Sequence, residues 1–110
     1  MLKVHEGADI AALMSELGVR ARAAARPLAV ATTERKNAAL LAMADALEAN
    51  TGDILEADAR DMEAGRAAGL SSALLDRLML DEKRIAAMAA GIREIARLED
   101  PVGKVIAAWE

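Results

Sequence analysis

The sequence is poor in the side chains that most enzymes and small secreted proteins depend on. Its 110 residues include no cysteine, phenylalanine or tyrosine, and one tryptophan and one histidine. Without cysteine the chain can form no disulfide, and it lacks a thiol nucleophile and the usual zinc ligand. Few aromatic or β-branched side chains remain to favour a sheet. The net charge of -4 and the pI near 5.0 argue against a nucleic-acid partner, whose phosphates attract basic surfaces.

Long hydrophobic runs are also missing. Glu6, Asp9 and Glu16 interrupt the N-terminal stretch, so no signal peptide is expected. The longest apolar runs are too short to span a bilayer. We therefore expect a cytoplasmic protein with no membrane partner.

Small aliphatic residues make up most of the chain. Hydrophobic residues are 55% of the total, mainly Ala, Leu, Ile and Met, which favour helices. We predict an all-α fold of four to five helices in an Ala/Leu-rich bundle, with a short extended C-terminal tail. The expected organisation is a flexible lead-in over residues 1–8, helices over 9–99, and a turn with the start of a strand over 100–110. Breaks are predicted near Pro27–Thr33, Asn50–Gly52, Gly69–Ser71 and Leu80–Asp81.

Capping residues and apolar spacing predict how these helices begin and pack. Helix starts are expected at Asp9, at Thr32 or Thr33, at the serine pair 71–72 and at Asp81. Pro27 should kink or end the first helix. Inward-facing sets are predicted in two helices: Leu40, Met43 and Leu47, with Leu41 and Ala44 beside them; and Ile54, Leu55, Ala59 and Met62. In the last helix, Ile85, Met88, Ile92 and Ile95 have the spacing of a seam against a partner.

The stretch 69–80, GLSSALLDRLML, is predicted to be the centre of the fold. A glycine suited to end one helix precedes two serines suited to begin the next. Leu74, Leu75, Leu78 and Met79 would then form one apolar face. A helix this short needs neighbours, so we expect it to lie as a wedge between longer helices.

No residue is assigned to catalysis, cofactor binding or metal binding. His5 is the only histidine and is expected to have no role. Glu56, Asp61 and Glu63 should form a solvated face, whereas Asp58 lies near an apolar face and is expected to cap or pair with a neighbour. Gly103-Lys104 lacks the flanking residues of a phosphate-binding loop, and the Gly65-x-x-x-Gly69 spacing indicates a helix end, not a dinucleotide site.

One basic patch has several possible interpretations. It comprises Arg20, Arg22, Arg26, Arg35 and Lys36. Solvated side chains and ion pairing with acidic helices are favoured over anion binding, since surface charges usually behave in these two ways.

Four stretches of the sequence form a recognisable set. They read KNAAL at 36–40, DILEADARD at 53–61, RAAGLSSALLDRLML at 66–80 and LEDPVGKV at 98–105. Together they resemble the N-terminal region of the gamma-glutamyl phosphate reductases, also called glutamate-5-semialdehyde dehydrogenases, in the aldehyde dehydrogenase superfamily. The resemblance runs from about Ile10 to about Ala108.

The resemblance implies an enzyme of proline biosynthesis. Such a reductase uses NADPH to convert glutamyl 5-phosphate to glutamate 5-semialdehyde through a thioester on a catalytic cysteine. This chain has no cysteine, and none of the family's catalytic residues maps onto it. We therefore expect a truncated N-terminal portion that is structural and inactive alone. It should leave an apolar surface open and form a homo-oligomer through it; the candidate residues are Ile85, Met88, Ile92 and Ile95 with the tail residues Val105, Ile106 and Trp109. The alternative is an independent helical protein-interaction module.

Overall fold

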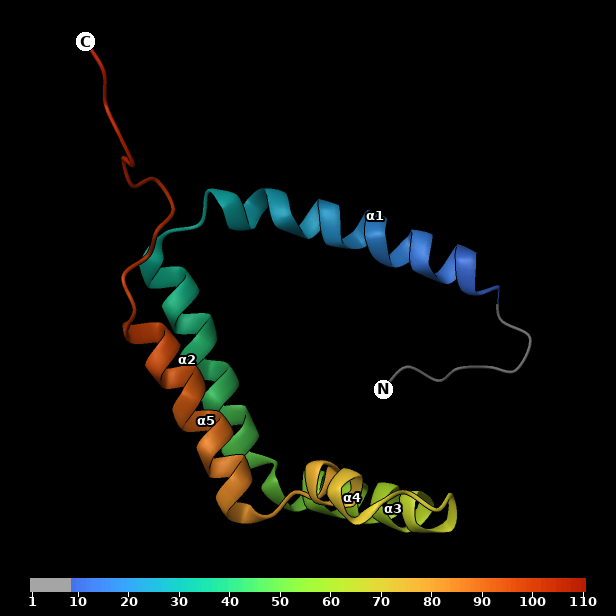
Figure 1. The fold of residues 1–110 in the computed structure, drawn as a ribbon. Coiled ribbons are helices and arrows are strands. Elements are labelled where there is room, and N and C mark those ends of the chain that lie inside the picture. Colours follow the sequence, from blue (N-terminus) through green and yellow to red (C-terminus); the bar gives the residue numbers. More distant parts are fainter. Residues whose placement is uncertain (1–8) are drawn as a thin grey trace. The chain divides into compact units, whose positions relative to one another are not determined.

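The computed structural model describes residues 9–110 and contains five helices (Figure 1). These are α1 (Ile10–Ala29), α2 (Thr33–Ala49), α3 (Thr51–Ala67), α4 (Ser72–Leu78) and α5 (Glu82–Arg97). No strand occurs within the described range, so the predicted all-α class is confirmed. The predicted lead-in over residues 1–8 lies outside the described residues.

Local capping chemistry determines where three helices begin. The carboxylates of Asp9 and Asp81 and the hydroxyl of Ser71 each accept a hydrogen bond from the amide three residues on, at 3.2, 2.7 and 3.3 Å. Such bonds satisfy amides that the first helical turn leaves without a partner. All three caps were predicted from the residue types.

The predicted breaks near Pro27–Thr33 and Asn50–Gly52 are both confirmed. Helix α1 ends at Ala29, two residues after Pro27, and α2 begins at Thr33. A proline in the last turn removes only one helical hydrogen bond, so the helix survives it. The break between α2 and α3 is the single residue Asn50, whose side-chain amide donates to the Ala46 carbonyl at 2.8 Å. Gly52 lies inside α3.

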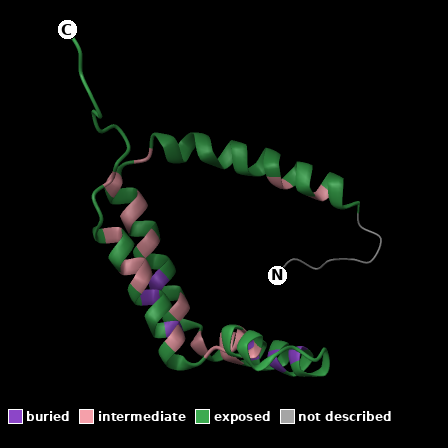
Figure 2. Ribbon diagram, in the orientation of Figure 1, coloured by how far each residue is buried: buried purple, intermediate pink, exposed green. Residues whose placement is uncertain are grey.

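The described chain divides into two units, and the buried core belongs to one of them. One unit contains α1 and the C-terminal tail, and α1 has no buried residue. The other unit, Glu34–Asp100, contains every buried side chain of the described range, as the purple segments of Figure 2 show. The buried residues are Ala44, Asp58, Met62, Gly65, Ile85 and Ala89.

Helices α2 and α5 run antiparallel, side by side (Figure 1). Ala44 and Ala89 are both 0% exposed, and small side chains let two helix backbones approach closely. The inward stripe of α2 is therefore Leu40, Ala44 and Leu47, and that of α5 continues from Ala89 to Ile85 and Ile92.

One sequence prediction about α2 is wrong. The predicted inward set of α2 fails because Met43 is 54% exposed and Leu41 is also exposed. On α5, Met88 and Ile95 are 45% and 54% exposed, as expected for the apolar surface predicted to be left open, whereas Ile85 is buried. In both helices the centre of the contact is an alanine, which turns the larger neighbouring side chains to the edge of the pair.

Helix α3 ends in a tight cap that brings α4 back against it. Gly69 has a φ of 76° and donates to the Arg66 carbonyl at 3.0 Å, while the Leu70 amide donates to the Gly65 carbonyl at 3.1 Å. This is the Schellman motif, in which a left-handed residue favours glycine. The predicted helix end at Gly69 is confirmed.

Gly65 has a packing role that the sequence prediction missed. It is buried, and a Cβ there would lie 3.0 Å from Leu70 Cδ1 and 3.3 Å from Leu75 Cδ2. The absent side chain therefore makes room for Leu75 of α4 and for Leu70 in the preceding turn. A second inward position on α3 also differs from prediction, since Ala59 is exposed and Asp58 is buried in its place.

The predicted wedge is only partly enclosed. Helix α4 packs on α3, yet it has no fully buried residue. Leu75, Leu78 and Met79 are half-buried, and Leu74 is exposed. A seven-residue helix covered on one side cannot bury all four side chains, so α4 lies against α3 instead of separating two long helices.

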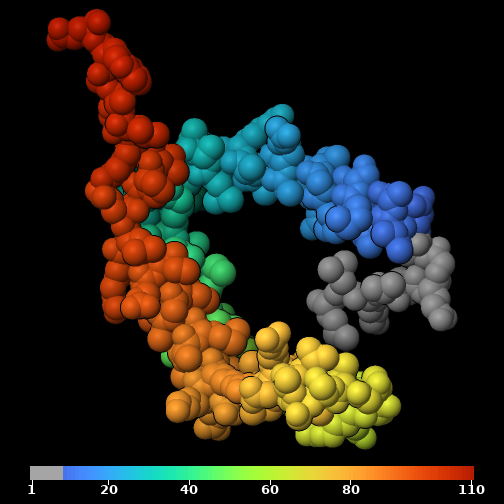
Figure 3. Space-filling view, viewed as in Figure 1, coloured from blue at the N-terminus to red at the C-terminus, as the bar shows by residue number. Residues whose placement is uncertain are grey.

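The C-terminal tail follows a turn at Gly103. This glycine has a φ of 86°, and the Lys104 amide donates to the Pro101 carbonyl at 3.2 Å. Residues 104–110 form no strand, and Val105, Ile106 and Trp109 are strongly exposed. Figure 3 shows this end of the chain, in red, as a thin string of atoms, which agrees with the predicted extended tail.

Candidate functional site

The most elaborate polar arrangement lies where α3, α4 and α5 meet, and Asp58 is at its centre. Asp58 is 8% exposed, and its Oδ2 accepts a hydrogen bond of 2.7 Å from the Leu80 amide. A buried carboxylate is costly unless it is hydrogen-bonded. The prediction that Asp58 pairs with a neighbour is confirmed, and its partner is the backbone that links α4 to α5.

Arg84 completes this junction from the first turn of α5. Its guanidinium donates to the backbone carbonyl of Asp76, to that of Met79 at 2.7 Å, and to the Asp76 carboxylate at 2.9 Å. It thereby satisfies carbonyls at the C-terminal end of α4 that have no partner within the helix. Asp58 and Arg84 together fasten the linker between two helices, which is a structural role.

A cavity of about 430 Å³ adjoins the junction. Its lining combines apolar side chains of α3 with Asp58, Arg66, the linker residues 79–81 and Glu82 of α5. The buried polar group among them, Asp58, accepts a hydrogen bond from the Leu80 amide of the linker.

The other α3 carboxylates lie as predicted on the surface. Glu56, Asp61 and Glu63 are exposed, and Glu56 pairs with Arg60 one turn on at 3.0 Å. No group of histidine, cysteine or carboxylate side chains within residues 9–110 is arranged to hold a metal ion. His5 lies outside the described residues.

One edge of the α2–α5 pair is charged. Arg93 of α5 donates to Asp45 at 2.8 Å and to both carboxylate oxygens of Glu48 at 2.8 Å. The hydrogen bond from Arg93 lowers the pKa of Glu48, and the hydrogen bonds to Glu48 and Asp45 raise the pKa of Arg93. These charges satisfy one another, so the charged edge (Asp45, Glu48 and Arg93) holds the two helices together.

The opposite edge of the same pair is apolar. We define the apolar edge as Met43 and Leu47 of α2 with Met88, Ile92 and Ile95 of α5. A groove of about 390 Å³ runs into it, lined by Met43, Ala46, Leu47, Asn50, Ile54 and Ile92. Met43 and Leu47 were predicted to be buried, whereas Met88, Ile92 and Ile95 were predicted to belong to an open apolar surface. Counting helical positions outward from the small residues Ala44 and Ala89 would have identified the edge.

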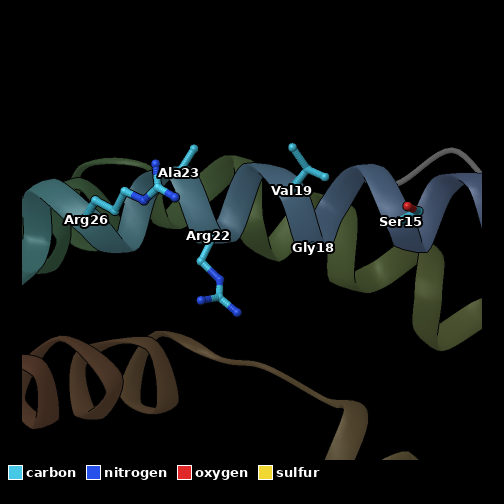
Figure 4. Close-up of a pocket in the computed structure, with 6 residues that line it drawn as sticks. All are labelled: Ser15, Gly18, Val19, Arg22, Ala23 and Arg26. Carbon is cyan, nitrogen blue, oxygen red and sulfur yellow. The ribbon is translucent and has the colours of Figure 1, made fainter.

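The predicted basic patch separates into different environments. Lys36 forms an ion pair with Asp100 at 2.5 Å, which supports the ion-pairing interpretation for this residue. Arg20, Arg22 and Arg26 are exposed on α1. In Figure 4, Arg22 extends away from α1 on the side opposite Val19 and Ala23.

The hollow drawn in Figure 4 is a shallow surface feature of one helix. Its volume is about 500 Å³, and all six lining residues belong to α1: Ser15, Gly18, Val19, Arg22, Ala23 and Arg26. A binding site normally gathers groups from several elements around an enclosed space. Two arginines along an exposed helix do not form such a site.

Membrane insertion is not indicated by the helices. None of those in residues 9–110 combines the length and the hydropathy needed to span a bilayer.

Comparison with known proteins identifies close relatives. The chain is 64% identical over 112 aligned residues to a gamma-glutamyl phosphate reductase of Mesorhizobium japonicum, 54% identical over 111 residues to one of Allorhizobium ampelinum, and 53% identical over 110 residues to one of Brucella anthropi. Each alignment covers all of this chain and 26% of the relative. No family model and no solved structure matches. The resemblance seen in the four sequence stretches is therefore confirmed across the whole chain, which spans about a quarter of its relatives' length.

Proposed function

We propose that this chain is the N-terminal helical portion of a gamma-glutamyl phosphate reductase and that its role within that enzyme is structural. The observation that carries the proposal is 64% identity across the entire chain to a quarter of one such reductase. The described residues agree with it, because their best-ordered polar groups, around Asp58 and Arg93, bind parts of the same chain.

The proposed reaction of the complete protein is the NADPH-dependent reduction of glutamyl 5-phosphate to glutamate 5-semialdehyde, in the cytoplasm and in proline biosynthesis. The name of the relatives supports a reductase of a glutamyl phosphate. When bound, NADPH would supply the hydride. A dinucleotide site requires a glycine-rich turn between a strand and a helix, and the glycines 65 and 69 form a helix cap instead. The groups that hold NADPH and attack the substrate therefore belong to other parts of the enzyme.

A chimaera of two homologous proteins tests this proposal. In it, the present chain replaces the corresponding quarter of the M. japonicum reductase, and NADPH oxidation with glutamyl 5-phosphate is measured. We expect activity within about tenfold of the parent, since substitutions away from the reacting groups rarely change the barrier by more than about 1.4 kcal/mol. The M. japonicum reductase lacking that quarter is the control and should be inactive. A folded but inactive chimaera would contradict the proposal.

The isolated chain is expected to have no reductase activity and no saturable NADPH affinity. Hydride chemistry on a covalent intermediate needs a nucleophile and a site that positions the nicotinamide, and a chain without cysteine lacks the nucleophile. Calorimetric titration with NADPH measures this directly, with the M. japonicum reductase as the positive control. Saturable binding by the isolated chain would contradict the assignment of a structural role.

An independent interaction module is the second candidate, favoured by the exposed apolar edge. On this second interpretation, copies of the isolated chain associate through exposed apolar helix faces and the tail. Light scattering across a concentration series tests the association.

A further inference from the structure

We propose that the apolar edge of the α2–α5 pair is a docking surface for the remaining polypeptide of the reductase, and not for a second copy of this chain. The inference rests on the proposed function and specifies which face of this helical portion meets the rest of the enzyme. The surface lies entirely within the unit Glu34–Asp100.

The apolar edge is exposed along both helices at once. Met43 of α2 and Ile95 of α5 are each 54% exposed, Met88 is exposed, and Leu47 and Ile92 are half-buried at the base. In each helix these residues lie on one side of the central alanine, at helical spacing. The antiparallel packing of α2 and α5 brings the two rows together, and the groove lined by Met43, Leu47, Ile54 and Ile92 lies between them.

The charged edge shows what a solvent-facing side of the same pair looks like. There, Arg93 bridges Asp45 and Glu48, and the three side chains satisfy one another in contact with water. The apolar edge contributes neither charge nor hydrogen bond, and contiguous exposed apolar patches mark interaction sites. The asymmetry between the two edges indicates that one is built for water and the other for a covering surface.

The size of the patch and the length of the relatives favour a covalently linked occupant. A stable interface between separate molecules buries roughly 800 Å² on each partner, and five side chains that are at most 54% exposed offer well below that. A linked partner is held at an effective concentration in the millimolar range, so a smaller surface is enough. The relatives contain about three quarters of their length beyond the aligned region, which supplies such a partner.

Methionine oxidation can test the docking surface because its two methionines are exposed. Hydrogen peroxide oxidises accessible thioethers to sulfoxides, and peptide mass spectrometry assigns each site. In the isolated chain we expect Met43 and Met88 to react quickly and the buried Met62 to react slowly. In the chimaera with the M. japonicum reductase, Met43 and Met88 should react at least about tenfold more slowly, and Met62 should remain slow.

A pair of substitutions gives a second measurement that does not depend on oxidation. Ile95→Glu changes the apolar edge, whereas Leu41→Glu places the same charge at an exposed position of α2 away from that edge. Both variants should leave the melting temperature of the isolated chain nearly unchanged. In the chimaera, Ile95→Glu should lower it by at least about 3 °C, the shift expected for roughly 1 kcal/mol in a domain of this order of size, and Leu41→Glu should not.

The outcomes separate this inference from the proposed function. A folded but inactive unsubstituted chimaera would contradict the proposed function. Equal oxidation of Met43 and Met88 in the isolated chain and in an active chimaera would overturn the docking surface alone. Protection that appears in the isolated chain and grows with its concentration would overturn it in favour of a second copy.

Discussion

Helices α1 and α5 have similar compositions but very different environments. Both are rich in alanine, both begin at an aspartate cap, and both carry aliphatic residues at helical spacing. Yet α1 has no buried residue along Ile10–Ala29, whereas α5 buries Ile85 and Ala89 completely. An apolar stripe shows which face of a helix can be covered. Whether it is covered depends on partner helices, which α5 finds in α2 and α3.

The largest expected effect comes from removing the buried side chain of α5. Ile85 is 1% exposed, so Ile85→Ala should lower the free energy of unfolding by about 2–5 kcal/mol through lost burial and the cavity left behind. Ile10→Ala in α1 is the matched control, and its exposed side chain should contribute less than about 0.5 kcal/mol. Urea unfolding followed by far-UV circular dichroism measures both. Equal losses would show that α1 is as well packed as α5.

A methyl group added at a glycine should have opposite effects in the two regions. Gly65→Ala places its Cβ 3.0 Å from Leu70 Cδ1, and overpacking of this kind costs about 1–3 kcal/mol. Gly18→Ala in α1 meets no atom within 4 Å. There it should stabilise the helix by about 0.5–1 kcal/mol because alanine loses less backbone entropy. Thermal melts of both variants provide the measurement, and stabilisation by Gly65→Ala would show that α4 does not need this close approach.

Two aspartates with backbone partners should also differ. Asp58→Ala removes the carboxylate that accepts the hydrogen bond of the part-buried Leu80 amide. An unsatisfied buried donor costs about 1–3 kcal/mol. Asp9→Ala removes the exposed cap of α1, where water can replace the lost bond, so the cost should be near the low end of about 0.5–2 kcal/mol. Hydrogen exchange at Leu80 provides a local readout. Unchanged protection of that amide in Asp58→Ala would mean that another group holds the linker.

The smallest effect concerns the charged edge and pH. Hydrogen bonding to Arg93 lowers the pKa of Glu48 from its usual 4.5. A depressed folded-state pKa contributes stability that is present above the unfolded value and is lost as pH falls through the folded value. Stability should therefore decline slightly in acid below pH 4.5, and Glu48→Gln should reduce this slope. Denaturation midpoints measured between neutral pH and acid would test it, and an unchanged slope would assign the acid sensitivity to other carboxylates.

Local chemistry made much of this fold predictable from the sequence. Asp9, Ser71 and Asp81 cap the helices that follow them because capping needs only a nearby side-chain oxygen. Asp58 could be singled out because a carboxylate one turn from Ile54 must either pair or face water. These inferences depend on residues within a few positions of one another.

The rotation of the helices about their axes was not predictable in the same way. Apolar size suggested that Met43 faces inward, but the fully buried positions of α2 and α5 include Ala44 and Ala89. The role of Gly65 depends on Leu70 and Leu75, which reach it only after the chain reverses. Which side chains meet across a turn is a tertiary property, and helical periodicity alone does not determine it.

The single aromatic residue has a practical consequence for spectroscopy. Trp109 is the only tryptophan, phenylalanine and tyrosine are absent, and this indole lies in the exposed tail. Its fluorescence should already be that of a water-exposed indole in the folded chain, and it should change little when the helices melt. Near-ultraviolet circular dichroism should likewise be almost blank for the folded state. Trp109 is instead a natural reporter of anything that covers the tail, because a blue shift of its emission would register that event while the helical core stays optically silent.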